Sequence, residues 1–201
     1  IKGSTAVVCI SEFTRQEVLE RYPSIPEEKL KVIHGGVDLE RFHPCSPGVI
    51  KEHYDLKDYL LCVGEVRPYK NIENVFRALE LWTDGPQLAI SGNILGNHKA
   101  KLENMARSLN IENRVTWLGY VPDDLLPNLY SEAAAFIFPS LYEGFGLPIL
   151  EAMACGCPTL SSNMASLPEI GGKATHFFDP KEIGDMAEAI KKVCEDSVYR
   201  Q

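Results

Sequence analysis

Short apolar runs alternate with longer amphipathic stretches from residue 59 to residue 195. The short runs are rich in Val, Ile, Leu, Ala and Phe, and the longer ones repeat apolar residues at helical spacing. We therefore predict strands at 59–64, 87–91, 114–118, 134–138, 158–161 and 175–178. Helices are predicted at 71–82, 98–109, 123–132, 148–155 and 181–195, with a short helical turn at 166–171. Continuously apolar strands separated by helices indicate an α/β fold, a doubly wound parallel sheet covered on both faces.

The N-terminal part of the chain carries a separate strand–helix–strand pattern. A strand is predicted at 5–10, a helix at 11–22 with Ser11 as its N-cap, and a turn with a second short strand at 26–33. Residues 35–58 are rich in Gly, Pro, His and charged residues and have no sustained periodicity. Such a composition is typical of a linker.

Composition favours a soluble globular protein. The chain has 201 residues, of which 45% are hydrophobic and 24% are charged, enough for one large domain with a sizeable core. The net charge of −8 argues against a general nucleic-acid binder, because affinity for a phosphate backbone needs clustered Lys and Arg. The apolar runs are far shorter than the roughly 20 residues that span a bilayer, and no signal peptide is evident. We therefore expect a cytoplasmic location.

The cysteines and histidines give no sign of a metal or redox site. Six cysteines are scattered along the chain, and Cys155-Gly-Cys157 lacks the C-x-x-C spacing of a zinc or redox pair. We predict small buried hydrophobic side chains and reduced thiols. The five histidines do not cluster at ligand spacing, and His34 and His43 are expected to be linker or surface residues.

The most informative stretch runs from Glu143 to Glu151 and reads Glu-Gly-Phe-Gly-Leu-Pro-Ile-Leu-Glu. Pro148 suits the first position of a helix, where its missing N–H is not needed. Gly144 and Gly146 free the preceding backbone to turn N–H groups toward an anion at the positive end of the helix dipole. Sugar and ribose hydroxyls on either side of a phosphate would suit the two carboxylates. The alternative is a plain loop-to-helix junction with Glu151 as an ordinary first-turn acid.

A basic pair, Arg67 and Lys70, follows the strand predicted at 59–64. A guanidinium grips two phosphate oxygens and an ammonium acts as a mobile point charge, so together they suit a diphosphate. The alternative is two solvated charges in a polar loop. Asn71 is expected to cap the helix that follows. Because parallel strands end at one edge of a sheet, the loops after them should line that edge. These loops are 64–70, 91–92, 119–122, 140–147 and 161–163.

The stretch from Glu143 to Glu151, followed by Ala-Met-Ala-Cys-Gly-Cys-Pro, closely resembles the donor site of retaining GT-B glycosyltransferases of family 4. The resemblance covers nearly the whole chain. It continues at Gly64-Glu-Val-Arg67-Pro-Tyr-Lys70-Asn71, at Leu118-Gly-Tyr-Val-Pro and at His34-Gly-Gly-Val-Asp-Leu-Glu-Arg-Phe42. It implies that residues 45–201 form a Rossmann-like nucleotide-sugar-binding domain. Residues 1–44 would be the end of the N-terminal acceptor domain and the interdomain connection.

The resemblance also implies roles for individual residues. Arg67 and Lys70 would hold the diphosphate and Glu143 the hydroxyls of the transferred sugar, and these three would be catalytic. Glu151 would bind the ribose. The other donor-binding residues implied are Gly64, Tyr120, Val121, Gly144, Phe145, Gly146 and Leu147. No metal or other cofactor is expected, because fixed cations and a helix N-terminus would meet the charge on the leaving nucleoside diphosphate.

Within this assignment Phe145, Gly146 and Leu147 would offer backbone amides to the sugar and phosphate. Tyr120 and Val121 follow the strand predicted at 114–118, and in the family this position reads the nucleobase largely through backbone groups. The alternative for Tyr120 is a simple packing aromatic.

The implied function is transfer of a sugar from a nucleotide diphospho-sugar to a saccharide or lipid-linked acceptor. Residues 162–170 resemble a version common in mannosyltransferases of polysaccharide synthesis, which favours GDP-mannose. Because the first element is already an apolar strand, we expect the acceptor-binding part of the N-terminal domain to be missing and the chain alone to be inactive. Family members often work as peripheral proteins at the inner face of the membrane, which is the second location considered.

Two alternatives have other functions. A non-catalytic nucleotide-binding module is disfavoured because the charged residues of both motifs are intact. Nucleotide-sugar epimerases of the same fold do not combine Arg-x2-Lys with Glu-x7-Glu at this spacing. Phosphorylases would need a cofactor-binding lysine that the sequence does not reveal.

Overall fold

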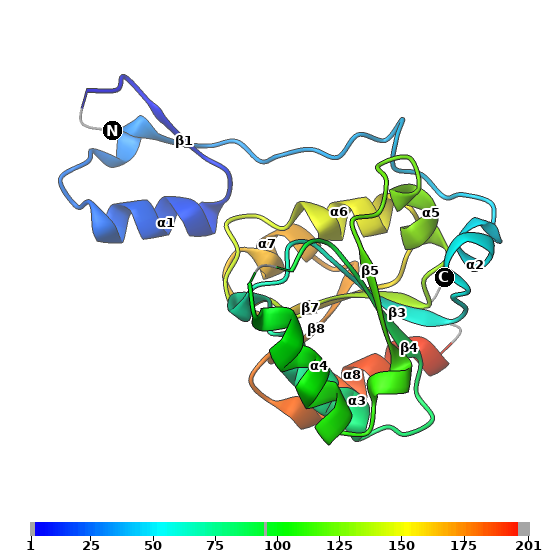
Figure 1. Ribbon diagram of the computed structural model, residues 1–201. Helices are drawn as coiled ribbons and strands as arrows, with labels where there is room; N and C mark the ends of the chain where they lie inside the picture. The colour runs from blue at the N-terminus through cyan, green and yellow to red at the C-terminus, as the bar shows by residue number, and fades with distance from the viewer. Residues whose placement is uncertain (1–2, 95, 197–201) are drawn as a thin grey trace.

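A computed structural model describes residues 3–94 and 96–196 of the chain. A small N-terminal lobe, residues 3–34, stands beside a larger body, and an extended linker joins them (Figure 1). The two parts have separate sheets, of two and six strands.

The body is built on a six-stranded sheet that is parallel throughout, in the order β5-β4-β3-β6-β7-β8. Its strands are β3 (Tyr59–Val63), β4 (Gln87–Ser91), β5 (Val115–Gly119), β6 (Ala135–Phe138), β7 (Thr159–Ser162) and β8 (Thr175–Phe178). The order reverses between β3 and β6, which pair directly with Leu60 opposite Ala135. Such a reversal leaves a crevice beyond the carboxyl ends of the two strands, where doubly wound proteins bind their ligands. The predicted fold class is therefore confirmed.

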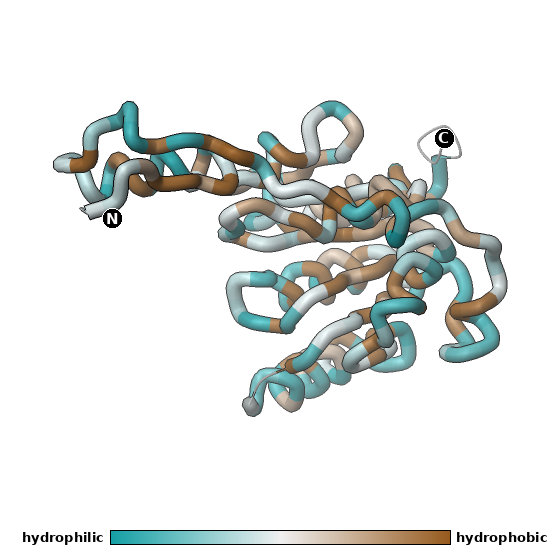
Figure 2. The backbone as a smooth tube through the Cα atoms, turned by 90° about the horizontal axis from the view of Figure 1, so that it is seen from above, coloured by the Kyte–Doolittle hydropathy of each residue, from teal (hydrophilic) through white to brown (hydrophobic). Residues whose placement is uncertain are grey.

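Helices cover both faces of the large sheet (Figure 1). One face carries α3 (Ile72–Glu80), α4 (His98–Ser108) and α8 (Ile183–Glu195), and the other α2 (Val49–Tyr54), α5 (Leu126–Ser131), α6 (Leu147–Ala154) and α7 (Leu167–Gly171). Successive residues of a strand point to opposite faces, so Leu60 joins the first apolar cluster and Leu61 the second. Both are fully buried. Apolar stretches accordingly alternate with hydrophilic ones along the chain (Figure 2).

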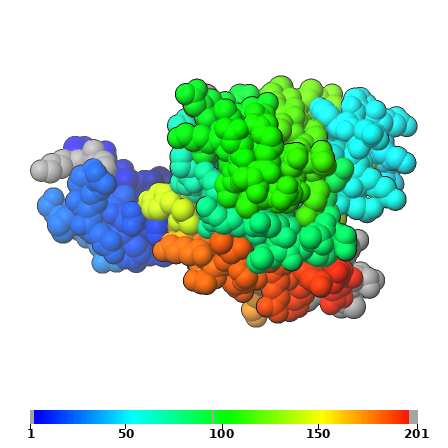
Figure 3. Space-filling model, turned by 60° about the horizontal axis from the view of Figure 1, so that its bottom comes forward, coloured from blue at the N-terminus to red at the C-terminus, as the bar shows by residue number. Residues whose placement is uncertain are grey.

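Short 3-10 turns complete the body and the lobe: η1 (Glu27–Lys29), η2 (Pro68–Lys70) and η3 (Glu112–Arg114). In the lobe, β1 (Val7–Cys9) pairs in parallel with β2 (Leu30–Val32) around α1 (Glu12–Arg21). Ser11 caps α1 as predicted, because its hydroxyl accepts the Thr14 N–H at 3.0 Å. Figure 3 shows the blue lobe lying against the yellow segment that follows β6.

The predicted linker at 35–58 was partly wrong, because it contains α2 and residues that belong to the core of the body. Gly48 begins α2 in the left-handed conformation with φ 115°, which glycine adopts without strain. Ile50 on α2 is fully buried. Upstream, Phe42 is buried and its ring centroid lies 6.2 Å from that of Tyr130.

Three local predictions also need correction. The Asn71 side chain does not cap α3 but donates to the carbonyls of Pro139 and Pro180, at 3.2 and 2.9 Å, and so ties the start of α3 to two neighbouring loops. Pro148 occupies the second position of α6, because Leu147 is the first. Glu151 lies beyond the first turn of α6, so the reading as a first-turn acid was wrong.

The six cysteines, all among the described residues, form no disulfide, and five of them are buried as predicted, whereas Cys45 is half-buried. Burial raises the pKa of Cys62 to about 12 and that of Cys155 to about 11. Both thiols therefore stay protonated at neutral pH and behave as small apolar side chains.

Candidate functional site

The loops that follow β3 and β6 meet where the strand order of the sheet reverses, which we call the switch point. The N–H of Leu141 donates to the carbonyl of Tyr69 at 2.8 Å. Beside this bond, Lys70 Nζ lies 2.6 Å from Glu143 Oε1, and the two side chains are only 15% and 16% exposed. The ion pair joins the two motifs that the sequence analysis singled out separately.

Lys70 is held in place by more than its carboxylate partner. Its Nζ lies 4.5 Å from the ring centroid of Phe138, within the range of a cation–π contact. A narrow pocket runs past the ammonium between the ends of β3 and β6 and includes Gly64, Glu65 and Pro139 in its lining. The cation is thus fixed at the crevice before any ligand arrives.

Two glycines bring the ends of neighbouring strands together. Gly64 and Gly92 have φ values of 127° and 130°. A Cβ on Gly92 would lie 2.1 Å from the Gly64 carbonyl oxygen, a distance that no side chain tolerates. The N–H of Gly64 donates to Ser91 and that of Gly92 to Gly119. The ends of β3, β4 and β5 therefore form one continuous edge, as predicted.

The start of α6 presents backbone N–H groups at the same edge. Gly146 is the N-cap with φ 113°, and a Cβ there would meet Leu167 at 2.9 Å. Within residues 3–94 and 96–196, no hydrogen bond joins the N–H groups of Phe145, Gly146 or Leu147 to a protein acceptor. These donors lie at the positive end of the helix dipole and can bind an anion. Phe145 is buried and Leu147 is exposed, and Glu143 and Gly144 precede them in the same loop.

Arg67 does not join the contact between Lys70 and Glu143. Its guanidinium donates from Nε and Nη2 to the carboxylate of Glu65 at 2.9 and 3.1 Å, and both side chains are exposed. Glu65 was not predicted as a site residue, although its position two residues before Arg67 was a usable signal. Arg67 thus lies on the rim of the crevice with a neighbouring acid as its partner.

Glu151 projects from α6 toward α5, where its Oε2 accepts a hydrogen bond from the Tyr130 hydroxyl at 2.9 Å. Burial raises the pKa of Glu151, and the bond from Tyr130 only partly offsets that effect. Tyr130 was not singled out from the sequence. At the end of β5, Tyr120 is 68% exposed, so the reading as a packing aromatic was wrong, whereas Val121 is buried.

Among the residues that the structure describes, no three His, Cys, Asp or Glu side chains are grouped so that they could hold a metal ion. Each helix between residues 3 and 196, with residue 95 left aside, is too short or too polar to cross a bilayer.

Comparison with known proteins matches two family profiles to consecutive parts of the chain. The profile described as Glycosyl transferases group 1 covers residues 50–201, and that described as Glycosyltransferase Family 4 covers residues 1–41. The chain is 33% identical over its whole length to O-antigen chain mannosyltransferase B of Escherichia coli, of which it spans 54%. It is 32% identical over 96% of its length to the serotype-specific mannosyltransferase WbdA of Escherichia coli, of which it spans 25%.

Solved structures give the same picture of the fold. HepE of Anabaena, determined in complex with UDP and glucose, superposes with a TM-score of 0.89 at 22% identity, over 98% of this chain and 55% of that one. Sucrose-phosphate synthase of Thermosynechococcus elongatus gives a TM-score of 0.83 at 25% identity, over 97% of this chain and 50% of that one. With a profile match over residues 50–201 and a 33% identical relative, this chain belongs to the group 1 glycosyltransferases of family 4, which have the GT-B fold.

Proposed function

We propose that this chain binds the nucleotide diphospho-sugar donor of a retaining glycosyltransferase, with the diphosphate at the switch point between β3 and β6. The observation that carries the proposal is the ion pair of Lys70 and Glu143 beside the unused N–H groups at the start of α6. A fixed cation, a carboxylate and three amide donors in one place suit a diphosphate that is joined to a sugar.

Without a ligand, Glu143 serves as the counter-ion of Lys70. A bound diphosphate takes over the ammonium and leaves the Glu143 carboxylate to accept hydrogen bonds from the hydroxyls of the transferred sugar. This exchange keeps the largely buried Lys70 paired with an anion throughout, which avoids the cost of an isolated buried charge. Arg67 can turn from Glu65 to the phosphates, because an exposed ion pair contributes little and breaks easily.

During transfer an acceptor hydroxyl oxygen bonds to the anomeric carbon, and the bond from that carbon to the diphosphate oxygen breaks. The hydroxyl proton passes to the departing nucleoside diphosphate, on which negative charge grows in the transition state. Lys70, Arg67 and the N-terminus of α6 stabilise that charge in the transition state more than in the ground state. Because these groups supply the positive charge, we propose a reaction that needs no metal ion.

Glu151 and the loop after β5 complete the nucleotide end. The Tyr130 hydroxyl fixes the direction of the Glu151 carboxylate, whose remaining lone pairs can accept bonds from ribose hydroxyls. The backbone at Tyr120 and Val121, together with Gly64 at the end of β3, lies at the same edge for contacts to the base and the phosphates.

The donor that we propose is GDP-mannose. Its support is the mannosyltransferase-like stretch at 162–170 and the names of the two Escherichia coli relatives. The acceptor, a saccharide or a lipid-linked saccharide, and any peripheral contact with the inner face of the membrane belong to this proposal for the whole protein. The chain spans about half the length of the first of those relatives, and the acceptor is assigned to the remainder.

Calorimetry and thermal melts of this chain with GDP, UDP, ADP and their sugar conjugates test the proposal. A nucleoside diphosphate at 100 times its Kd should raise the free energy of unfolding by about 2.7 kcal/mol. Lys70→Ala should lose most of the binding. The matched control is Lys99→Ala, which removes an exposed ammonium paired with Glu103 on α4 and should bind like the parent.

The donor-site proposal is wrong if no nucleotide at millimolar concentration moves the melting temperature of the parent. The same titrations in EDTA and in magnesium should agree, and a strict need for magnesium would contradict the metal-free part alone. Tighter binding of UDP-glucose than of GDP-mannose would replace the proposed donor.

A further inference from the structure

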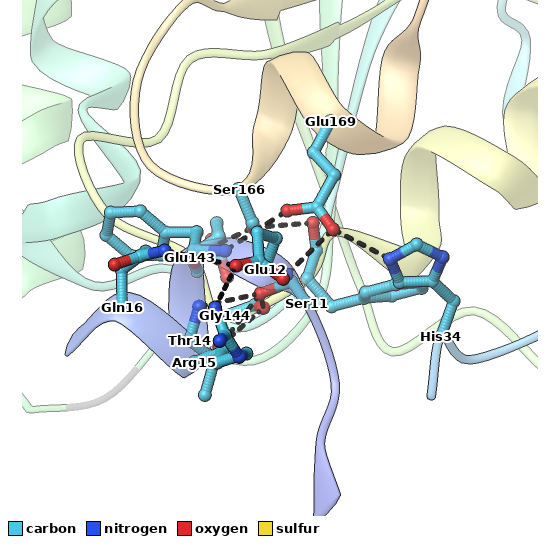
Figure 4. Close-up of polar contacts among 12 residues, drawn as sticks. Ser11, Glu12, Thr14, Arg15, Gln16, His34, Glu143, Gly144, Ser166 and Glu169 are labelled. Atoms are coloured by element: carbon cyan, nitrogen blue, oxygen red, sulfur yellow. Dashed lines mark hydrogen bonds and ion pairs between the residues drawn. The ribbon is translucent and has the colours of Figure 1, made fainter. Parts of the chain in front are cut away.

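Two hydroxyls of the N-terminal lobe hold the loop that carries Glu143. The Ser11 hydroxyl donates to the Gly144 carbonyl at 2.7 Å, and the Thr14 hydroxyl reaches the same oxygen at 3.1 Å (Figure 4). Ser11 is fully buried, and its oxygen also accepts the Thr14 N–H in the first turn of α1. The first turn of α1 is therefore fastened to the β6–α6 loop, residues 139–146.

Ser166 holds the same loop from within the body. Its hydroxyl lies 2.9 Å from the carbonyl oxygens of both Glu143 and Phe145, and the side chain is fully buried. The carbonyls of Glu143, Gly144 and Phe145, three consecutive residues, are therefore all within hydrogen-bond distance of a hydroxyl. In a planar trans peptide the carbonyl of one residue points opposite to the N–H of the next, so a bond to the carbonyl fixes that N–H. The bonds to Gly144 thus set the direction of the Phe145 N–H.

Glu169 on α7 fastens the lobe to the body. Its carboxylate accepts the N–H groups of Glu12 and Phe13 at 2.8 and 3.2 Å and lies 2.7 Å from His34 Nε2 (Figure 4). These N–H groups begin α1 and have no acceptor inside the helix, so a carboxylate is favourable there. Burial raises the pKa of Glu169, but the two N–H groups and His34 outweigh it and leave the pKa below its usual value. Glu169 therefore stays ionised at neutral pH.

We infer that Ser11, Thr14 and Glu169 are positioning residues through which the N-terminal lobe sets the direction of the Phe145 N–H. We call these three residues and their bonds the interlobe contact. Its effect on the loop follows from the geometry alone, whereas its effect on ligand binding rests on the proposed function. With the lobe docked, the peptide between Gly144 and Phe145 is oriented in advance, so less ordering is needed when an anion binds. With the lobe released, that peptide can rotate.

Thr14 is the cleanest position for a test, because Ser11 also caps its helix. Thr14→Val removes the hydroxyl and nearly keeps the shape, whereas Thr14→Ser keeps the hydroxyl. Ser108→Ala is the matched control, because Ser108 bonds the Met105 carbonyl on α4 and does not contact the loop. Order parameters from ¹⁵N relaxation of the Gly144, Phe145 and Gly146 amides are measured without a nucleotide, and GDP is then titrated.

Thr14→Val should lower the order parameter of the Phe145 amide from about 0.85, the value of rigid backbone, toward about 0.6. GDP should bind about 3- to 10-fold more weakly, as for the loss of one hydrogen bond. Thr14→Ser and Ser108→Ala should match the parent in both measurements. Rescue by serine distinguishes the hydroxyl from simple packing of the lobe.

Glu169→Gln tests the same inference from the side of the body, because Glu169 lies on α7 and the Ser11 cap of α1 is left unchanged. The substitution replaces one of the two accepting oxygens by an NH2 group, which is a donor and cannot accept an N–H, so loop order and GDP binding should fall by similar factors. Glu188→Gln, an exposed acid on α8, is its control.

The two hypotheses fail in different ways. If loop order falls in Thr14→Val but the parent binds no nucleoside diphosphate, the interlobe contact stands and the proposed function falls. If Thr14→Val and Glu169→Gln leave both loop order and GDP binding unchanged, or if Thr14→Ser behaves like Thr14→Val, the positioning role is overturned.

Discussion

The switch-point ion pair and the interlobe contact hold the same loop by different physical means. Lys70 and Glu143 form a short pair, largely removed from solvent, at the edge of a sheet with an apolar cluster on each face. The interlobe contact joins that body to a lobe whose own core has only three buried residues, Cys9, Ile25 and Leu30, among those described. A buried charge cannot lose its partner cheaply, whereas bonds near solvent can be exchanged for water. The loop is therefore held by one contact that is costly to break, the ion pair, and by one that exchanges easily with water, the interlobe contact.

Breaking the ion pair of Lys70 and Glu143 should have the largest effect on stability. Lys70→Ala leaves the Glu143 carboxylate largely buried without its cation, which should cost roughly 3 kcal/mol, the low end of the range for a broken buried pair. Urea denaturation measures the loss. The double variant Lys70→Met with Glu143→Gln removes both charges and should recover most of it. A loss below about 0.5 kcal/mol in Lys70→Ala would mean that the pair behaves as a surface pair.

The two carboxylates of the 143–151 motif should separate by ligand. Glu143→Gln should spare GDP and weaken GDP-mannose, because its assigned partner is the sugar. Glu151→Gln should weaken both ligands, because its assigned partner is the ribose. Each loss should be about 1.5–3 kcal/mol, measured by calorimetry. If Glu143→Gln weakens both and Glu151→Gln only the sugar conjugate, the two roles must be exchanged.

Acid should weaken the interlobe contact by protonating Glu169. The pKa of Glu169 is lowered in the folded chain, so its contribution is fully present above the usual value of about 4.5 and is lost as the pH falls through the lower, folded-state pKa. We expect about 1 kcal/mol of lobe docking to disappear, because the carboxylate is partly exposed. The ¹⁵N–¹H shifts of Glu12 and Phe13 from pH 7 to pH 3 report the change. Glu169→Gln should show no such titration, and a midpoint above pH 4.5 in the parent would contradict the sign.

Arg67 should show the smallest effect on stability. Its pair with Glu65 is exposed, so Arg67→Ala should leave the free energy of unfolding nearly unchanged while weakening GDP binding about 10-fold or more. Glu65→Ala is the matched partner variant and should bind GDP at least as tightly as the parent, because it frees the guanidinium. If Arg67→Ala binds GDP like the parent, Arg67 is only a surface charge.

Elements with a long apolar signal were predictable from the sequence. The strand predicted at 87–91 is β4 at the same residues, and the helix predicted at 98–109 is α4 to within one residue. The helix α2 was not predicted, because its six residues are too few for a repeat and left-handed Gly48 and Asp55 flank it. The capping role predicted for Asn71 was wrong because the carbonyls that its side chain binds belong to Pro139 and Pro180, far along the chain.

The candidate site was predicted in part. The rule that loops after parallel strands share an edge brought the motifs of Lys70 and Glu143 to one place. Their direct contact depends on β3 lying beside β6, which the local pattern does not specify. The bond from Thr14 to Gly144 spans 130 residues and likewise has no local signal. The roles assigned to individual site residues, and the boundary between residues 44 and 45, stay predictions.

The buried Phe42 ring anchors the linker to the body. Just before it, the Asp38 carboxylate accepts the N–H groups of Glu40 and Arg41 and so stiffens the backbone there. Only seven residues, 35–41, then separate the lobe from this anchor, a reach of at most roughly 30 Å when fully extended. A linker of this length keeps the lobe at an effective concentration in the millimolar range beside the surface of the body that it contacts. A contact too weak to join two separate molecules is therefore occupied for much of the time within one chain.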